Sequence, residues 1–175
     1  LKQTGGDNIT YVPTSPVYDG VVRVLDAGNN VIKTLDISVP AGYTVWDTQV
    51  KALANGGFVV AWSQLEATNW TDFSVHYAIY DNDGNLQSSN TLASPGVGVT
   101  IAAQSSANGG DFAISYQTMG PGTDQQQAVS VFHYNGSGSS FTEGTQTLIG
   151  GNSASQNFGG VASPAVQLMK FQLTP

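Results

Sequence analysis

The segment 81–85 (DNDGN) has the residue types best suited to a hard cation, because carboxylates and amides alternate within five positions. A calcium loop of the EF type needs oxygen ligands before its central glycine and an acidic residue at its twelfth position. Placing Gly84 at the sixth position puts Asn90 at the twelfth, so the required acid is missing. A hairpin turn is the favoured interpretation. A calcium site that uses Asp81 and Asp83 is the alternative, and no other cofactor is indicated.

The two histidines do not suggest a zinc site or an acid–base pair. Segment 75–81 maps onto segment 129–135, so His133 takes the place of Ile79. His76 then lies on the opposite face of the equivalent strand. Because a shared metal or proton-transfer pair needs both imidazoles on one side, we expect ordinary core or surface histidines.

Other catalytic patterns are absent from the sequence. The chain has no cysteine, and no Gly-x-Ser-x-Gly element lies between a strand and a helix. Glu66 and Glu143 are the only glutamates, and nothing in the sequence brings them together as a glycosidase pair requires. We therefore expect a protein that is not an enzyme.

Trp70 is the aromatic residue best placed to bind a ligand. It lies in the polar run 68–72, where a large ring has no obvious local partner. An exposed indole can stack on the apolar face of a sugar, while the side chains of Asn69 and Asp72 take the sugar's hydroxyl groups. The favoured interpretation is that Trp70 folds over a sheet edge or seals a subunit contact.

A second loop takes the equivalent place in the next repeat. The two loops, 65–72 and 118–126, should emerge at one rim of the protein, and binding residues concentrate on such loops. A carbohydrate-binding site at this rim is therefore retained as an alternative function. Its candidate residues are Asn69, Trp70, Asp72, Asp124 and Gln125.

An internal repeat determines which elements hold these loops. Segment 55–64 (NGGFVVAWSQ) returns as segment 108–117 (NGGDFAISYQ), and Trp62 corresponds to Tyr116 at an offset of 54 (116 − 62). A fixed period of this length is typical of stacked supersecondary units, each of which buries its apolar face against the next.

Short β-rich runs fill each repeat, and no apolar stripe recurs at helical spacing. Asn-Gly, Asp-Gly and Gly-Gly pairs separate the runs, and such pairs supply the positive φ of tight hairpin turns. The expected strands are 21–26 and 31–38; then 44–53, 58–64, 73–81 and 86–92; then 99–105, 112–117, 127–134 and 141–149; and last 165–173.

This order predicts an all-β protein of antiparallel, four-stranded repeat units. The single domain 1–175 divides into a half unit (10–42), two units (43–95 and 96–150) and a closing strand within 151–175. Four antiparallel strands in ~50 residues are typical of a β-propeller blade. Because about three blades are fewer than the usual ~4–8, a β-sandwich or a prism-like barrel is the alternative.

Composition limits the partners. Five basic and twelve acidic residues give a net charge of −7, so nucleic-acid binding and attraction to anionic membranes are not expected. No apolar run reaches the ~18 residues of a membrane span, so no membrane insertion is expected. Only 10% of the residues are charged, and this neutral polar surface favours an extracellular or cell-surface protein. Because the chain begins at Leu1, we expect a processed or excised piece.

Segment 53–62 (LANGGFVVAW) followed by segment 77–85 (YAIYDNDGN) resembles the repeats of large exported bacterial proteins of the hemolysin-type (RTX-associated) adhesin group. The match is good over 49–92 and weaker over 103–148, where Tyr116 replaces the tryptophan. The resemblance implies a secreted, cell-surface or filament context and no particular reaction. The calcium-binding nonapeptides of such proteins are absent.

We therefore expect a non-enzymatic extracellular module with a structural or adhesive role. Self-association, or binding of neighbouring protein subunits, is expected through sheet edges, because unpaired edges accept a strand from a neighbour. Glycans bound at the rim are the alternative partners.

Overall fold

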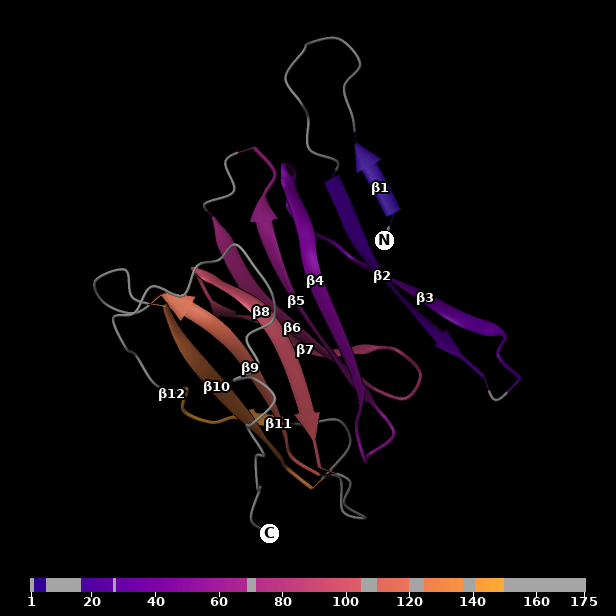
Figure 1. The fold of residues 1–175 in the computed structure, drawn as a ribbon. Helices are drawn as coiled ribbons and strands as arrows, with labels where there is room; N and C mark the ends of the chain where they lie inside the picture. The colour runs from indigo at the N-terminus through magenta and orange to yellow at the C-terminus, as the bar shows by residue number, and fades with distance from the viewer. Residues whose placement is uncertain are drawn as a thin grey trace.

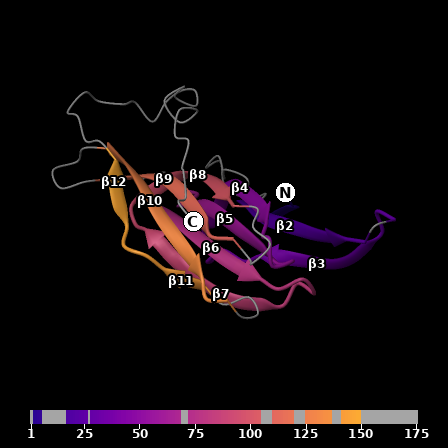
Figure 2. The ribbon, with the colours of Figure 1, turned by 90° about the horizontal axis from the view of Figure 1, so that it is seen from below.

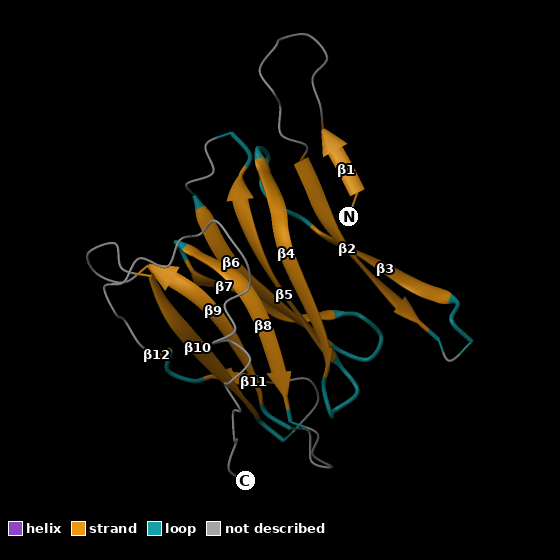
Figure 3. Ribbon diagram, viewed as in Figure 1, coloured by secondary structure: helices purple, strands orange, loops and turns teal. Residues whose placement is uncertain are grey.

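The computed structural model describes residues 2–5, 17–26, 28–68, 72–104, 110–119, 125–136 and 141–149. Every regular element within these ranges is a β-strand, which confirms the predicted all-β class (Figure 3). The same residues contain no helix that is long and apolar enough to cross a membrane. The expected strand at 165–173 lies outside the described residues.

The described strands form three antiparallel sheets. The first sheet has the order β1 (Lys2–Gly5), β2 (Val17–Leu25) and β3 (Val31–Ile37). The central sheet has the order β4 (Tyr43–Ala52), β5 (Phe58–Glu66), β6 (Phe73–Tyr80) and β7 (Leu86–Ala93). The third sheet contains β8 (Gly96–Ala103), β9 (Phe112–Met119) and β10 (Gln125–Tyr134), with β11 (Phe141–Glu143) and β12 (Thr147–Ile149) both paired to β10.

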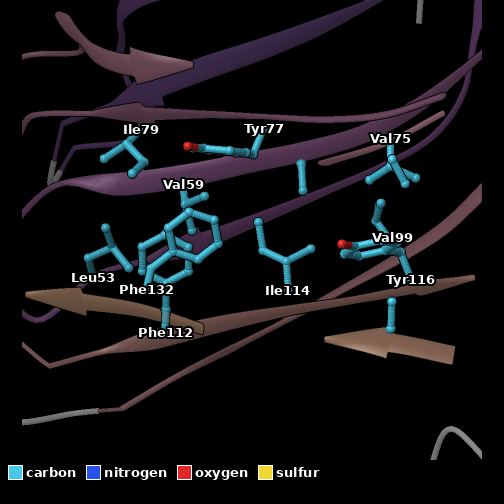
Figure 4. Packing of buried hydrophobic residues seen from close by; sticks show 13 residues of the cluster. Leu53, Val59, Val75, Tyr77, Ile79, Val99, Phe112, Ile114, Tyr116 and Phe132 are labelled. Atoms are coloured by element: carbon cyan, nitrogen blue, oxygen red, sulfur yellow. The ribbon is translucent and has the colours of Figure 1, made fainter. Parts of the chain in front are cut away.

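The central sheet lies between the other two, and the described strands form no closed barrel (Figures 1 and 2). The larger hydrophobic cluster fills the space between the central and third sheets, where Phe112 and Phe132 meet Val59 and Tyr77 (Figure 4). A smaller cluster joins the first and central sheets and has as its buried members Val22, Ile37, Val45 and Val60.

Aromatic pairs show that the central and third sheets follow one plan. In the central sheet, Phe58 is the cross-strand partner of Tyr80, and their rings stack with centroids 5.0 Å apart. In the third sheet, Phe112 is the partner of Phe132, and these rings stack at 4.5 Å. Stacked aromatic pairs contribute stability beyond the area that they bury. The predicted repeat of the second strand, in which Phe58 corresponds to Phe112, is therefore confirmed.

The third strands of the two units correspond at an offset of 52, so the offset of 54 predicted from the sequence is wrong there. Ala78 pairs with Val60, and Ser130 pairs with Ile114, which makes Ala78 the counterpart of Ser130 (130 − 78). A shift by two positions leaves every side chain on the same face of the sheet. The hydrophobic pattern therefore cannot distinguish the two registers.

Two strands also differ from expectation. β1 was not expected, because Lys2–Gly5 shows no apolar alternation, yet this segment pairs with β2. The expected strand 141–149 is divided into β11 and β12. The N–H of Gly144 continues the pairing of β11 with a hydrogen bond to the carbonyl of Val131 at 2.7 Å, and β12 then pairs with β10 in a register shifted by one residue.

Candidate functional site

The Asp-Asn-Asp-Gly-Asn segment forms a hairpin turn held together by its first aspartate. Oδ1 of Asp81 accepts hydrogen bonds from the N–H groups of Asp83 (2.9 Å) and Asn85 (2.8 Å). Oδ2 accepts the side-chain amides of Asn85 and Gln87, each at 3.0 Å. These bonds, with that from the Asn85 backbone foremost, lower the pKa of Asp81. Gly84 supplies the left-handed backbone of the turn with a φ of 72°.

The first sheet contains the same turn, in which Asp26 takes the place of Asp81. Oδ1 of Asp26 accepts the N–H groups of Gly28 and Asn30, both at 2.8 Å, and the Asn30 side chain lowers the pKa of this carboxyl most. Gly28 holds the position that Asp83 holds in the turn after β6, so a turn of this shape forms without a second carboxylate. The described residues hold no group of three or more potential metal-ligating side chains. The calcium site at Asp81 and Asp83 stays a prediction.

Two of the five predicted rim residues lie within the described ranges. Asp72 is exposed, and its carboxylate accepts a hydrogen bond from the hydroxyl of Tyr43, which raises the pKa of Tyr43. The Asp72 carbonyl accepts the N–H of Glu66 at 3.2 Å, so the end of this loop is tied to β5. Gln125 is the first residue of β10. Outside the described residues lie Asn69, Trp70 and Asp124.

The strands that lead into the two predicted loops share one direction. β5 and β9 both end toward the upper side of the molecule in Figure 1. This agrees with a common rim. Among the predicted rim residues in the described part of the chain, Asp72 makes a side-chain contact, with the hydroxyl of Tyr43.

His76 belongs to a polar and aromatic row across the central sheet. Its ring stacks on Trp62 with centroids 5.5 Å apart. Its Nε2 lies 2.8 Å from the hydroxyl of Ser74, and its Nδ1 lies 3.1 Å from that of Thr91. Burial lowers the pKa of His76, because a charged imidazole is poorly solvated there. This arrangement is that of a satisfied structural histidine.

His133 lies in the third sheet, whereas His76 lies in the central sheet. The Nδ1 of His133 is 2.9 Å from a carboxylate oxygen of Asp111, and its side chain is 59% exposed. The corrected register makes His133 the counterpart of Asp81 (133 − 81 = 52), and the predicted correspondence with Ile79 is wrong. The structure does not bring the two histidines together.

Asp47 is a structurally important carboxylate that the sequence analysis did not single out. It follows an irregularity in β4 and is half-buried. Its Oδ1 accepts hydrogen bonds from the N–H (3.2 Å) and the hydroxyl of Ser63, and its Oδ2 accepts the N–H of Val99 in β8 at 2.8 Å. Burial raises the pKa of Asp47, while the bonds from Val99 and Ser63 act in the opposite direction. The only signal in the sequence is a carboxylate within a strand.

One face of the central sheet carries large apolar side chains that are incompletely covered. We call it the open face and define it by Val50, Phe58, Trp62 and Tyr80, which lie on the side that looks toward the first sheet. Val50 is 49% exposed, and the three aromatic residues are half-buried. Trp62 shares its repeat position with the buried Tyr116, and that position alone does not tell how much of the neighbouring sheet covers each side chain.

Comparison with known proteins does not assign these features. No family model, no curated protein and no solved structure matches this chain.

Proposed function

We propose that this chain is a non-enzymatic, extracellular structural or adhesive module that associates with neighbouring copies. The observation that carries the proposal is the repetition of one sheet plan along a stack. The central sheet packs one face on the first sheet and the other on the third, so further sheets could join by the same kind of contact. Only 10% of the residues are charged, so contacts between copies would be formed mainly by neutral side chains.

The sheets are proposed to act as propeller-like blades. β4 and β8, the first strands of two successive sheets, lie against each other, as do the first strands of neighbouring blades. Three sheets are fewer than the ~4–8 of a usual ring. Blades contributed by neighbouring copies would extend the stack.

Contact through sheet edges is expected to be selective, because several edges carry features that oppose pairing. β3 presents the charged side chains Lys33 and Asp36. The outer edge of the third sheet is divided between β11 and β12. β7 is uncharged, but its pairing with β6 skips Gln87 and Leu92, so the regular part is short. Charges and bulges of this kind limit edge pairing.

Sedimentation velocity of the full chain over a concentration series tests the proposal. We expect assemblies that grow with concentration and persist at high salt, because few charges are available to hold them together. A single monomeric species at every concentration up to the solubility limit would contradict an assembly role.

Carbohydrate binding at the rim is retained as a second candidate. The observation that favours it is Asp72, whose exposed carboxylate is oriented by the hydroxyl of Tyr43 and so offers a fixed hydrogen-bond acceptor. Glycan-array binding should be lost in Trp70→Ala and in Asp72→Asn, and retained in Asn82→Ala, an exposed position in the turn after β6. An array without binding would remove this candidate.

A further inference from the structure

The first sheet covers the central sheet less completely than the central sheet covers the third. β8, the first strand of the third sheet, lies against β4, β5 and β6. β4 holds the same place in the central sheet, yet among the described strands of the first sheet it lies extensively only against β2. The described first sheet has three strands, and β1 is four residues long, whereas its counterpart β5 is nine residues long.

The exposure of repeat-equivalent side chains reports the same difference. In the third sheet, Phe112, Tyr116 and Phe132 are 0%, 1% and 1% exposed. Their counterparts in the central sheet are half-buried, and they are the aromatic members of the open face, Phe58, Trp62 and Tyr80. The same motif positions are therefore sealed at one interface and partly open at the other.

The uncovered surface extends onto β4. Val50 is 49% exposed, although its cross-strand partner Val60 is 1% exposed and belongs to the smaller hydrophobic cluster. Its counterpart Ile101, which pairs with Ile114, packs against the larger cluster. The open face is thus continuous with an existing sheet–sheet interface, and incompletely covered apolar side chains that adjoin one another mark candidate contact sites.

We propose that a second copy of this chain covers the open face by adding an extended strand to the first sheet. The added strand would lie beyond β1, in the position that β4 and β8 hold in the other two sheets. Its backbone would pair with a sheet edge, and alternate side chains would lie on Val50 and the aromatic residues. This inference rests on the proposed self-association and names the surface that would be used.

The run 165–173 (AVQLMKFQL) is the segment of the second copy that fits best. It is predicted from sequence to be a strand, and a strand would place Met169, Phe171 and Leu173 on one side. β12, the last described strand, lies at the opposite end of the stack from β1 (Figure 1). Donation of this run from the side where β12 ends, to an acceptor face on the other side, would give a head-to-tail contact, which generates rings or filaments.

Two variants of the full chain test this arrangement. Val50→Glu places a charge on the acceptor face, and Phe171→Glu places one in the donor run. Each should raise the dissociation constant measured by sedimentation about tenfold or more, because an unpaired charge is costly to bury in an apolar contact. The matched control is Leu148→Glu on β12 in the third sheet, an exposed leucine outside both the open face and the run 165–173, and it should associate like the wild type.

Mixing supplies the sharper result. Val50→Glu keeps its donor run, and Phe171→Glu keeps its acceptor face, so an equimolar mixture should form dimers and nothing larger. An excess of a synthetic 161–175 peptide should dissociate wild-type assemblies, whereas the same peptide with Phe171→Glu should not. Far-UV circular dichroism of each variant verifies that the β-structure is intact.

Different outcomes would overturn different statements. If the wild type associates and Val50→Glu associates equally well, or if the mixture stays monomeric, the open face is not the contact and self-association still stands. A wild type that stays monomeric at all concentrations would overturn the proposed assembly function together with this inference.

Discussion

Phe58 and Phe112 allow the difference between the two sheet interfaces to be measured directly. They hold the same position in their repeat, and each stacks on an aromatic partner across the strand. Phe112 is 0% exposed, whereas Phe58 is half-buried. We predict that Phe112→Ala destabilises the protein much more than Phe58→Ala does.

The expected magnitude follows from burial. Truncation of a fully buried phenylalanine to alanine costs about 3–5 kcal/mol, which includes the lost transfer free energy and the cavity left behind. For Phe58, water already reaches part of the ring and can fill the space of the missing side chain. We therefore expect a cost of about 1–2 kcal/mol for Phe58→Ala, at the level of an incompletely buried apolar side chain.

Equilibrium urea unfolding of the full chain, followed by far-UV circular dichroism and by tryptophan fluorescence, provides the assay. Coincident transitions from the two probes justify two-state analysis. Phe112→Leu is the matched control, and it should recover much of the stability lost in Phe112→Ala because it retains most of the apolar volume. The measurement belongs at a concentration where the chain is monomeric, since association adds stability by mass action.

Equal losses for the two alanine variants would refute this reasoning. They would mean that the interface between the first and central sheets is as well sealed in solution as that between the central and third sheets. The proposal of an open face would then lose its basis.

Three further predictions concern single residues. Burial raises the pKa of Asp47. The stability that protonation of Asp47 contributes is therefore present below about pH 3.8 and is lost as the pH rises through the folded-state pKa. Urea midpoints measured across a pH series should show the wild type losing stability relative to Asp47→Asn as the pH rises through this range. The pKa of Asp81 is lowered, so the ionised carboxylate stabilises the fold above about pH 3.8. Asp81→Asn should reduce the urea midpoint at pH 7, and the difference from the wild type should shrink as the pH falls below about 3.8. A difference in midpoint that stays constant with pH would exclude a role for the charge. Gly84→Ala should cost about 1–2 kcal/mol because of its left-handed backbone, while Gly28→Ala, in the equivalent turn but without a positive φ, should cost less in the same thermal or urea unfolding experiment.

Local sequence rules were sufficient for most of the described strands and for the turns after β2 and β6. Alternating apolar residues and Gly-containing turns predicted the all-β class and the positions of most strands. Asp26 and Asp81 begin the turns after β2 and β6. Each carboxylate accepts nearby backbone N–H groups, so these turns form without help from the rest of the fold. These features depend only on residues close together along the chain.

Only the tertiary structure decided the register of β10, the partner of Asp47 and the burial of the repeated aromatics. A register shift by two positions preserves the faces of a strand, so the choice between offsets of 52 and 54 depends on contacts across the sheet. Asp47 becomes a link between sheets because Val99, distant from it in the sequence, lies beside it in space. Phe58 and Phe112 share one motif position, and the sheet that covers each of them sets their different exposure, which no local pattern records.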